Sequence, residues 1–128
     1  MTVGISTVNV ANEVLDWLRG ETPPPVPGLF VKIHIGDPGA NGTANSSAVT
    51  TRRQATMNAA AGGSITLSAM SGSWAMTASE TITHISVHTA ASGGNFLLSA
   101  ALITPRTVVN GDTLTMTTLV VGHTPLAA

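Results

Sequence analysis

Apolar residues at the start of the chain recur with the period of a helix. Their spacing of three or four residues gives one apolar stripe, with charged and amide residues on the other side. Ser6, Thr7 or Asn9 can cap the first turn, and Gly20 suits the position after the last turn. The pattern therefore predicts a helix over residues 7–19. Its stripe consists of Val8, Ala11, Val14, Leu15, Trp17 and Leu18.

Four prolines within residues 23–27 follow this helix and prevent its continuation, because proline lacks the amide donor and favours an extended polyproline conformation. We therefore expect an N-terminal arm with its linker over residues 1–27 and a body over residues 28–128. A helix this short is marginal in water. Its stripe has to be buried either on its own body or on a neighbouring subunit, and the stiff linker favours the neighbour.

From residue 29 onward the pattern changes to the two-residue alternation of β-strands. In LFVKIHI (29–35) one face is aliphatic, and in TITHISVHT (81–89) Ile85 and Val87 lie opposite His84, Ser86 and His88. Threonine and β-branched residues dominate this part, which argues against helix. Strands are predicted over residues 29–35, 52–57, 64–70, 74–76, 81–89, 96–103 and 114–121. Their spacing predicts an all-β body, a β-sandwich or a jelly-roll-like fold.

Glycine-containing segments separate these strands. In HIGDPG (34–39) we expect Asp37 to accept hydrogen bonds from backbone amides, Pro38 to fix φ and a glycine to adopt positive φ. The alternative, Asp37 as a calcium ligand, finds only Asn41 and Asn45 nearby, whereas calcium needs several carboxylates. A further turn at residues 110–112 predicts a hairpin between residues 108–109 and 114–121. The expected turn residues are Gly36, Asp37, Pro38, Gly39, Gly93, Gly94, Gly111 and Asp112.

The composition excludes several functional classes. Charged residues make up 9% of the 128 residues, against roughly 25% in an average soluble domain, and the net charge of −1 rules out a basic nucleic-acid-binding surface. No apolar run approaches the ~20 residues of a membrane span, and the N-terminus lacks the features of a secretory signal. The chain has no cysteine, which fits assembly in a reducing cytoplasm. A surface so poor in charge suits a component that neighbours cover.

Candidate catalytic residues are present but match no motif. They are His34, His84, His88, His123, Asp37, Asp112 and Glu80. On a strand, His84 and His88 lie about 13 Å apart, too far to share a metal ion. No zinc-protease, serine-hydrolase or phosphate-loop pattern occurs. We therefore expect no enzyme activity, no metal site and no cofactor.

Interface residues are expected on the arm and at two places in the body. An ion pair or an inter-subunit contact explains the basic pair Arg52-Arg53 better than an anion site does. Trp17 and Trp74 are typical of core or interface anchors. Sugar stacking on Trp74 is the alternative, although carbohydrate sites usually add tyrosine and carboxylates. The expected interface residues are Val14, Trp17, Leu18, Arg52, Arg53 and Trp74.

The segment LFVKIHIGDPGANGTA (29–44) resembles the "LHTGDPG…GT" segment of small structural proteins of tailed phages that infect actinobacteria, a family labelled tail-fibre-like or head-decoration. Further similar segments at residues 53–55, 83–85, 90–97 and 104–113 extend the resemblance over residues 29–121. The N-terminal helix and linker lie outside the shared part, and Thr51 stands where an aromatic residue commonly precedes the arginine. The resemblance implies a β-sandwich virion protein without enzyme activity, in either the head or the tail.

We therefore expect a non-enzymatic phage virion protein, first of all a capsid decoration protein that stabilises the head surface by binding the major capsid protein. A single compact body without coiled coil or repeats favours the head. The alternatives are a tail-fibre or tail-tip protein that binds tail proteins, and a carbohydrate-binding adsorption module. A homo-oligomer is expected because the apolar strand edges carry few charges. The expectation of a trimer rests on analogy with other phage decoration proteins.

Overall fold

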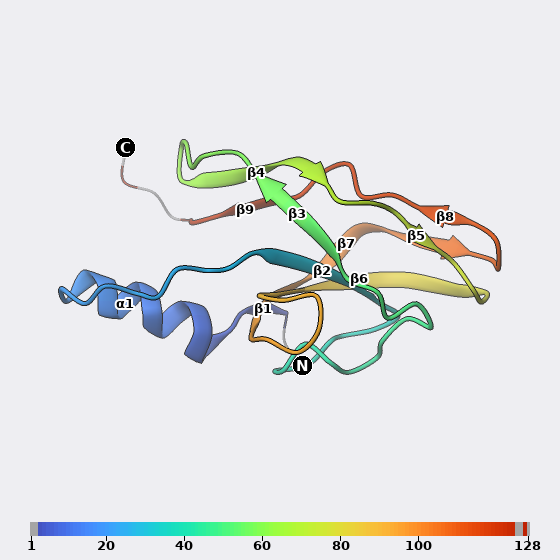
Figure 1. Cartoon of the computed structure of the whole chain (residues 1–128), viewed down its shortest axis with the longest axis horizontal. Helices are drawn as coiled ribbons and strands as arrows, with labels where there is room; N and C mark the ends of the chain where they lie inside the picture. Colours follow the sequence, from blue (N-terminus) through green and yellow to red (C-terminus); the bar gives the residue numbers. More distant parts are fainter. Residues whose placement is uncertain (1–2, 125–126, 128) are drawn as a thin grey trace.

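The computed structural model describes residues 3–124 and residue 127. An all-β body preceded by one helix is confirmed (Figure 1). The elements are β1 (Gly4–Ile5), a π-helical turn η1 (Thr7–Ala11), α1 (Asn12–Leu18), β2 (Leu29–His34), β3 (Arg53–Met57), β4 (Ser64–Met70), β5 (Trp74–Ala75), β6 (Glu80–His88), β7 (Phe96–Val108), β8 (Thr113–Leu114) and β9 (Val120–Gly122).

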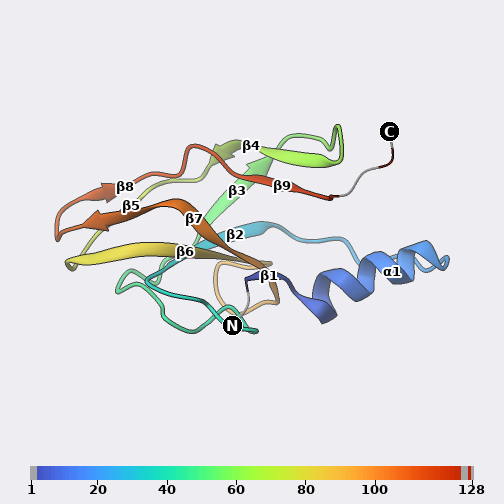
Figure 2. The ribbon, with the colours of Figure 1, turned by 180° about the vertical axis from the view of Figure 1, so that it is seen from behind.

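Seven strands form one antiparallel sheet in the order β1-β7-β6-β2-β3-β4-β9. The sheet curls over itself, so that β4 and β9 lie in one layer and β2, β6 and β7 in the other, with β3 crossing between them (Figures 1 and 2). The short strands β5 and β8 pair with each other and extend the layer that contains β4 and β9. The curled sheet thus makes the two layers of a sandwich from nearly continuous hydrogen bonding.

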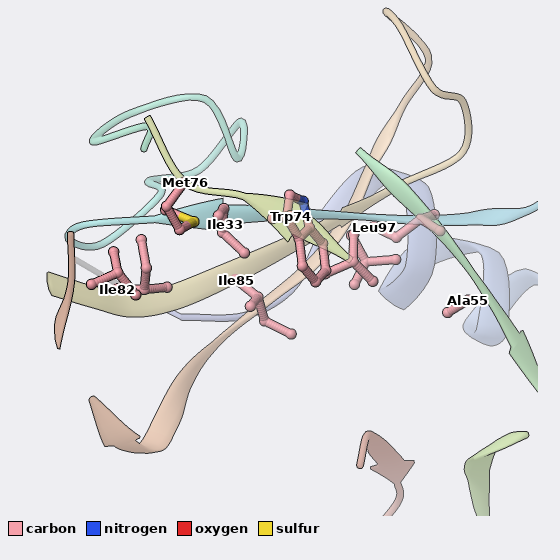
Figure 3. Close-up of a cluster of buried hydrophobic side chains, with 10 residues drawn as sticks. Ile33, Ala55, Trp74, Met76, Ile82, Ile85 and Leu97 are labelled. Carbon is pink, nitrogen blue, oxygen red and sulfur yellow. The ribbon is translucent and has the colours of Figure 1, made fainter. Parts of the chain in front are cut away.

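The core fills the space between the two layers (Figure 3). Val31 and Ile33 of β2 are fully buried, as the alternation predicts, together with Ile85 and Val87 of β6. Trp74 is the largest of the fully buried side chains, and its indole Nε1 donates a 2.9 Å hydrogen bond to the carbonyl of Thr51. The expectations that Trp74 anchors an interface or stacks on a sugar are therefore wrong, because its ring lies inside the body.

Most strand predictions agree with the structure, but the predicted C-terminal hairpin is wrong. β8 pairs with β5, at Trp74 and Leu114, and β9 pairs with β4. The turn at residues 110–112 exists, yet Met76 holds it through two backbone bonds, from Met76 N to Asp112 O and from Gly111 N to Met76 O. The chain after the turn therefore crosses to the other layer instead of returning along β7.

The two tryptophans make a matched test of this core. Trp74→Ala should lower the free energy of unfolding by about 3–5 kcal/mol, because it opens a cavity and leaves the Thr51 carbonyl without its donor. Trp17→Ala should change it by no more than about 0.5 kcal/mol, because the Trp17 side chain is 61% exposed. Urea unfolding followed by circular dichroism measures both. Equal losses in the two variants would contradict the assignment of Trp74 to the core and Trp17 to the surface.

Candidate interaction surfaces

The N-terminal arm is fixed to the body only at its base. Ser6 donates its amide to the carbonyl of Leu97 (2.6 Å), and the Asn9 side chain donates to the carbonyl of Phe96 (2.9 Å). The Ser6 hydroxyl accepts the Asn9 amide at 3.1 Å, so one of the predicted caps is confirmed. Beyond this base, α1 extends away from the sheet (Figures 1 and 2).

The apolar stripe of the arm is not covered by its own body. No residue of α1 is buried, and the exposed fractions are 60% for Leu15, 61% for Trp17 and 69% for Leu18. Val10, one turn before Val14, is partly buried and packs against the core. Exposed aliphatic side chains on a short helix are unfavourable in water. The apolar stripe of α1 is thus uncovered in the single chain, and its docking on a neighbouring subunit stays a prediction.

The arm and its proline-rich linker run back alongside each other and border an apolar groove of about 740 Å³. The groove lies between the arm and the strand ends that carry Leu97, Leu98 and Val121. Val14 and Trp17 line it, whereas Leu15 and Leu18 do not. The arm thus has an inner side toward this groove and an outer side formed by Leu15 and Leu18.

A second groove, which we call the seam, lies where the curled sheet fails to close. It has a volume of about 550 Å³ and runs between residues 100–106 of β7 and residues 114–120. Within the described residues, no strand pairing joins these two segments. The buried residues Ile33, Trp74 and Ile82 contribute to its floor.

An irregularity in β7 shapes the rim of the seam. Ile82 pairs with Arg106 and His84 with Ala101, so residues 102–105 of β7 face a single residue of β6. Such a bulge pushes side chains away from the sheet, and Ile103 is fully exposed as a result. Arg106 is also exposed, and its side chain borders the same groove.

The second face of the β2–β6 pair carries a buried polar chain of hydrogen bonds. His34 Nδ1 lies 2.8 Å from the carbonyl oxygen of Ala44, and His34 Nε2 lies 2.7 Å from the Ser86 hydroxyl. The same hydroxyl lies 2.9 Å from His88 Nε2. With both rings neutral, His88 Nε2 donates to Ser86, Ser86 donates to His34, and His34 Nδ1 donates to Ala44, so that each contact pairs one donor with one acceptor.

The environment keeps both histidines neutral. Burial lowers the pKa of His88 to about 4, and the positive charge of Arg52 adds to this effect. Burial likewise lowers the pKa of His34, although its hydrogen bond to the Ala44 backbone acts in the opposite direction. The Lys32 ammonium lowers both. The cluster therefore acts as a structural support for the loop above it at neutral pH.

That loop spans residues 36–47 and forms a lid over the polar face. Ile35 donates its amide to Asn45, and Ser47 donates its amide to Ile33, so both ends of the loop are tied to β2. At Gly42 φ is +68°, and a Cβ there would lie 2.3 Å from the Phe96 ring. The lid can therefore approach His88 and Phe96 only because residue 42 is glycine.

The turn at Asp37 has the predicted form. Its carboxylate Oδ1 accepts the amide of Gly39 at 2.8 Å, and Gly39 has φ +76°. Asp112 similarly accepts the amide of Val109 at 3.0 Å. Gly93, Gly94 and Gly111 all adopt positive φ. In the part of the chain that the structure describes, no group of three His, Cys, Asp or Glu is placed to hold a metal ion.

The basic pair of the body serves internal contacts. Arg52 donates to the carbonyls of Ala90 and Gly93 at 2.8 and 2.7 Å, and Arg53 donates to the carbonyl of Ser73 at 2.9 Å. These bonds fix two turns of the same chain. Among the described residues neither arginine forms the expected ion pair, and the inter-subunit contact stays a prediction. Among the residues described, no helix is long and apolar enough to cross a membrane.

Sequence reasoning found the arm but missed the seam and the polar cluster. Leu15 belongs to the predicted stripe, yet only Val14, Trp17 and Leu18 were expected to be interface residues. Ile103 and Arg106 gave no signal, because the bulge that exposes them depends on the register between β6 and β7. The signal for the polar cluster was the alternation of His84, Ser86 and His88, which ordinarily indicates a face in contact with water.

The geometry is that of an antiparallel β-body that carries a projecting, apolar N-terminal arm. A comparison with family models gives the class of protein. Residues 4–123 match the Gp80 family, described as podophage GP4 fiber I protein gp80. The match covers nearly the whole chain, so the chain belongs to this family of phage structural proteins. No curated protein matches it.

The family match bears on two expectations. It begins at Gly4 and thus includes the arm, which had been placed outside the shared part of the phage proteins that the sequence resembles. The family is also described as a fibre family, whereas the first expectation was a decoration protein of the head. The coarser statement, a phage structural protein, is confirmed, and head and tail are not distinguished by the match.

The polar cluster predicts a specific loss of stability in acid. Because the pKa of His88 is about 4 in the folded chain and about 6.5 when unfolded, the unfolded chain takes up protons first as the pH falls. The contribution of His88 to stability is therefore complete above pH 6.5 and is lost progressively down to about pH 4, by at most roughly 3 kcal/mol. Urea unfolding at a series of pH values measures it. His88→Gln should flatten this part of the profile, and an unchanged slope would contradict the assignment.

Asp37 gives a test of turn against metal site. Asp37→Ala should cost about 1 kcal/mol, because the Gly39 amide loses its acceptor. Asp37→Asn keeps an oxygen at the same place and should retain most of the stability. Thermal unfolding with calcium and with EDTA should give the same melting temperature for the wild type. A melting temperature several degrees lower in EDTA would show that Asp37 binds a cation.

Proposed function

We propose that the chain is a non-enzymatic structural component of a phage particle, built into the fibre of its tail. The observation that carries this proposal is the exposed apolar arm in a chain that matches a fibre family from Gly4 to His123. A fibre subunit needs a segment that joins it to its neighbours. The helix and its linker supply such a segment at one end of the molecule (Figure 1).

The physical basis of the proposal is the cost of leaving the arm uncovered. Leu15 and Leu18 are more than half exposed, and each would gain roughly 1.5–3 kcal/mol from full burial. The chain also has only 11 charged residues to keep such surfaces in solution. Covering the arm in an assembly removes both difficulties at once.

A capsid decoration protein that binds the major capsid protein is the second candidate. It is favoured by the compact two-layer body, since the described residues contain neither a coiled coil nor a repeated unit that would lengthen a fibre. In either role we propose that the chain forms a homo-oligomer, with a trimer as the favoured state. The part of β7 beyond its pairing with β1 leaves one edge of the strand unpaired, and this edge and the apolar arm both support self-association.

The abundance of the chain in purified phage particles tests both candidates. The measurement is quantitative mass spectrometry of the particles, with the major capsid protein as the internal standard. A fibre component should be present in a handful of copies, because a particle carries few fibres. A decoration protein should reach hundreds, in a fixed ratio to the capsid protein. Absence of the chain from washed particles would refute both.

A further inference from the structure

Two uncovered surfaces lie in different parts of the same molecule, and their shapes are complementary, because one projects and the other is recessed. The outer side of the arm presents Leu15 and Leu18 as projecting apolar side chains. The seam is a recess between β7 and residues 114–120 with an apolar floor. The arm extends from one end of the long axis, while β7 and β8 extend toward the other (Figure 1). An arm therefore has its complementary surface on another copy of the chain.

The distribution of charge points in the same direction. Residues 3–27 contain three carboxylates and one arginine, which gives the arm a net charge of −2. Residues 28–124 contain four cations and three carboxylates, which gives the body a net charge of +1 with histidine neutral. Two arms in contact would bring together segments of the same sign. An arm in contact with a body brings together opposite signs.

The positive charge of the body is available at the seam. Arg52 and Arg53 are occupied by carbonyl groups of their own chain, whereas Arg106 is exposed on the rim of the seam. On the arm, Arg19 already binds Asp16 at 2.7 Å and lies 3.7 Å from Glu21. The arm therefore keeps an excess of negative charge beside Leu15 and Leu18.

We infer that the outer side of the arm, Leu15 and Leu18, docks into the seam of a second copy, with the arm carboxylates facing Arg106. This inference rests on the proposed structural role and names the partner as the chain itself. Ile103, fully exposed on the rim, closes against the incoming helix. The seam, with a volume of about 550 Å³, supplies the recess for the two leucine side chains.

The contact joins two different surfaces, so each copy offers one of each. Contacts of this kind close into a ring, such as a trimer, when the rotation between copies allows it, and otherwise continue as a filament. In both cases the assembly contains at least three copies. A symmetric dimer, by contrast, requires the same surface on both partners.

Complementary variants test this inference in the full-length chain. Leu15→Asp/Leu18→Asp destroys the arm surface and leaves the seam intact. Ile103→Asp/Arg106→Glu destroys the seam and leaves the arm intact. All four side chains are exposed, so both variants should fold, which circular dichroism and the melting temperature verify. Ile35→Asp is the matched control, because Ile35 is an exposed aliphatic residue outside both surfaces.

Light scattering coupled to size-exclusion chromatography should show wild type and Ile35→Asp as assemblies of three or more copies. Each double variant alone should be a monomer of about 12.9 kDa, with self-association weakened at least about tenfold. An equimolar mixture of the two double variants should give a dimer and nothing larger, because only one intact arm and one intact seam remain to meet.

Three results would overturn the inference. The first is a wild type that remains a monomer or stops at a dimer. The second is assembly by either double variant alone, since a seam variant that still assembles would place the arm on another surface. The third is a mixture that yields no dimer. These measurements use purified protein, so such results would not refute the proposed function. That function is tested separately, by the abundance of the chain in phage particles.

Discussion

The structure depends on the burial of both faces of the central strand pair β2–β6. One face supplies Val31, Ile33, Ile85 and Val87 to the apolar core, where they meet Trp74 across the curled sheet. The other face carries His34, Ser86 and His88, which water would solvate if nothing covered them. The lid formed by residues 36–47 covers them instead. The hydrogen bonds among the two imidazole rings, the Ser86 hydroxyl and the Ala44 carbonyl replace those that water would make.

This double burial shows how far the sequence predicts the fold. Alternation identified the strands and assigned Ile85 and Val87 to the core face, because the side-chain period of a strand is a local property. It could not reveal that the polar face is also buried, because the cover comes from a loop whose approach depends on Gly42. The pairing of β8 with β5 was equally hidden, since it is decided by bonds between Met76 and a distant turn.

The same division applies to the candidate surfaces. The arm could be predicted because a helical apolar stripe followed by prolines is a local pattern of consecutive residues. The seam could not, because it results from a register irregularity between Ile82 and His84 and from the failure of β7 to pair with the chain after β8. A tryptophan is a poor guide in isolation: Trp17 and Trp74 look alike in the sequence, and their surroundings are opposite.

The body and the arm differ in how far their polar and apolar groups are used within the chain itself. In the body, the guanidinium groups of Arg52 and Arg53 donate to backbone carbonyls and hold two turns in place. Their hydrogen-bonding capacity is thus used within the body. The arm is different, because the short strand β1 together with Ser6 and Asn9 ties only its base to β7, and no residue of α1 is buried. Selection for stability of a free monomer would favour burying or shortening such a helix. A neighbouring subunit that covers Leu15 and Leu18, as proposed above, would remove the cost of exposing them.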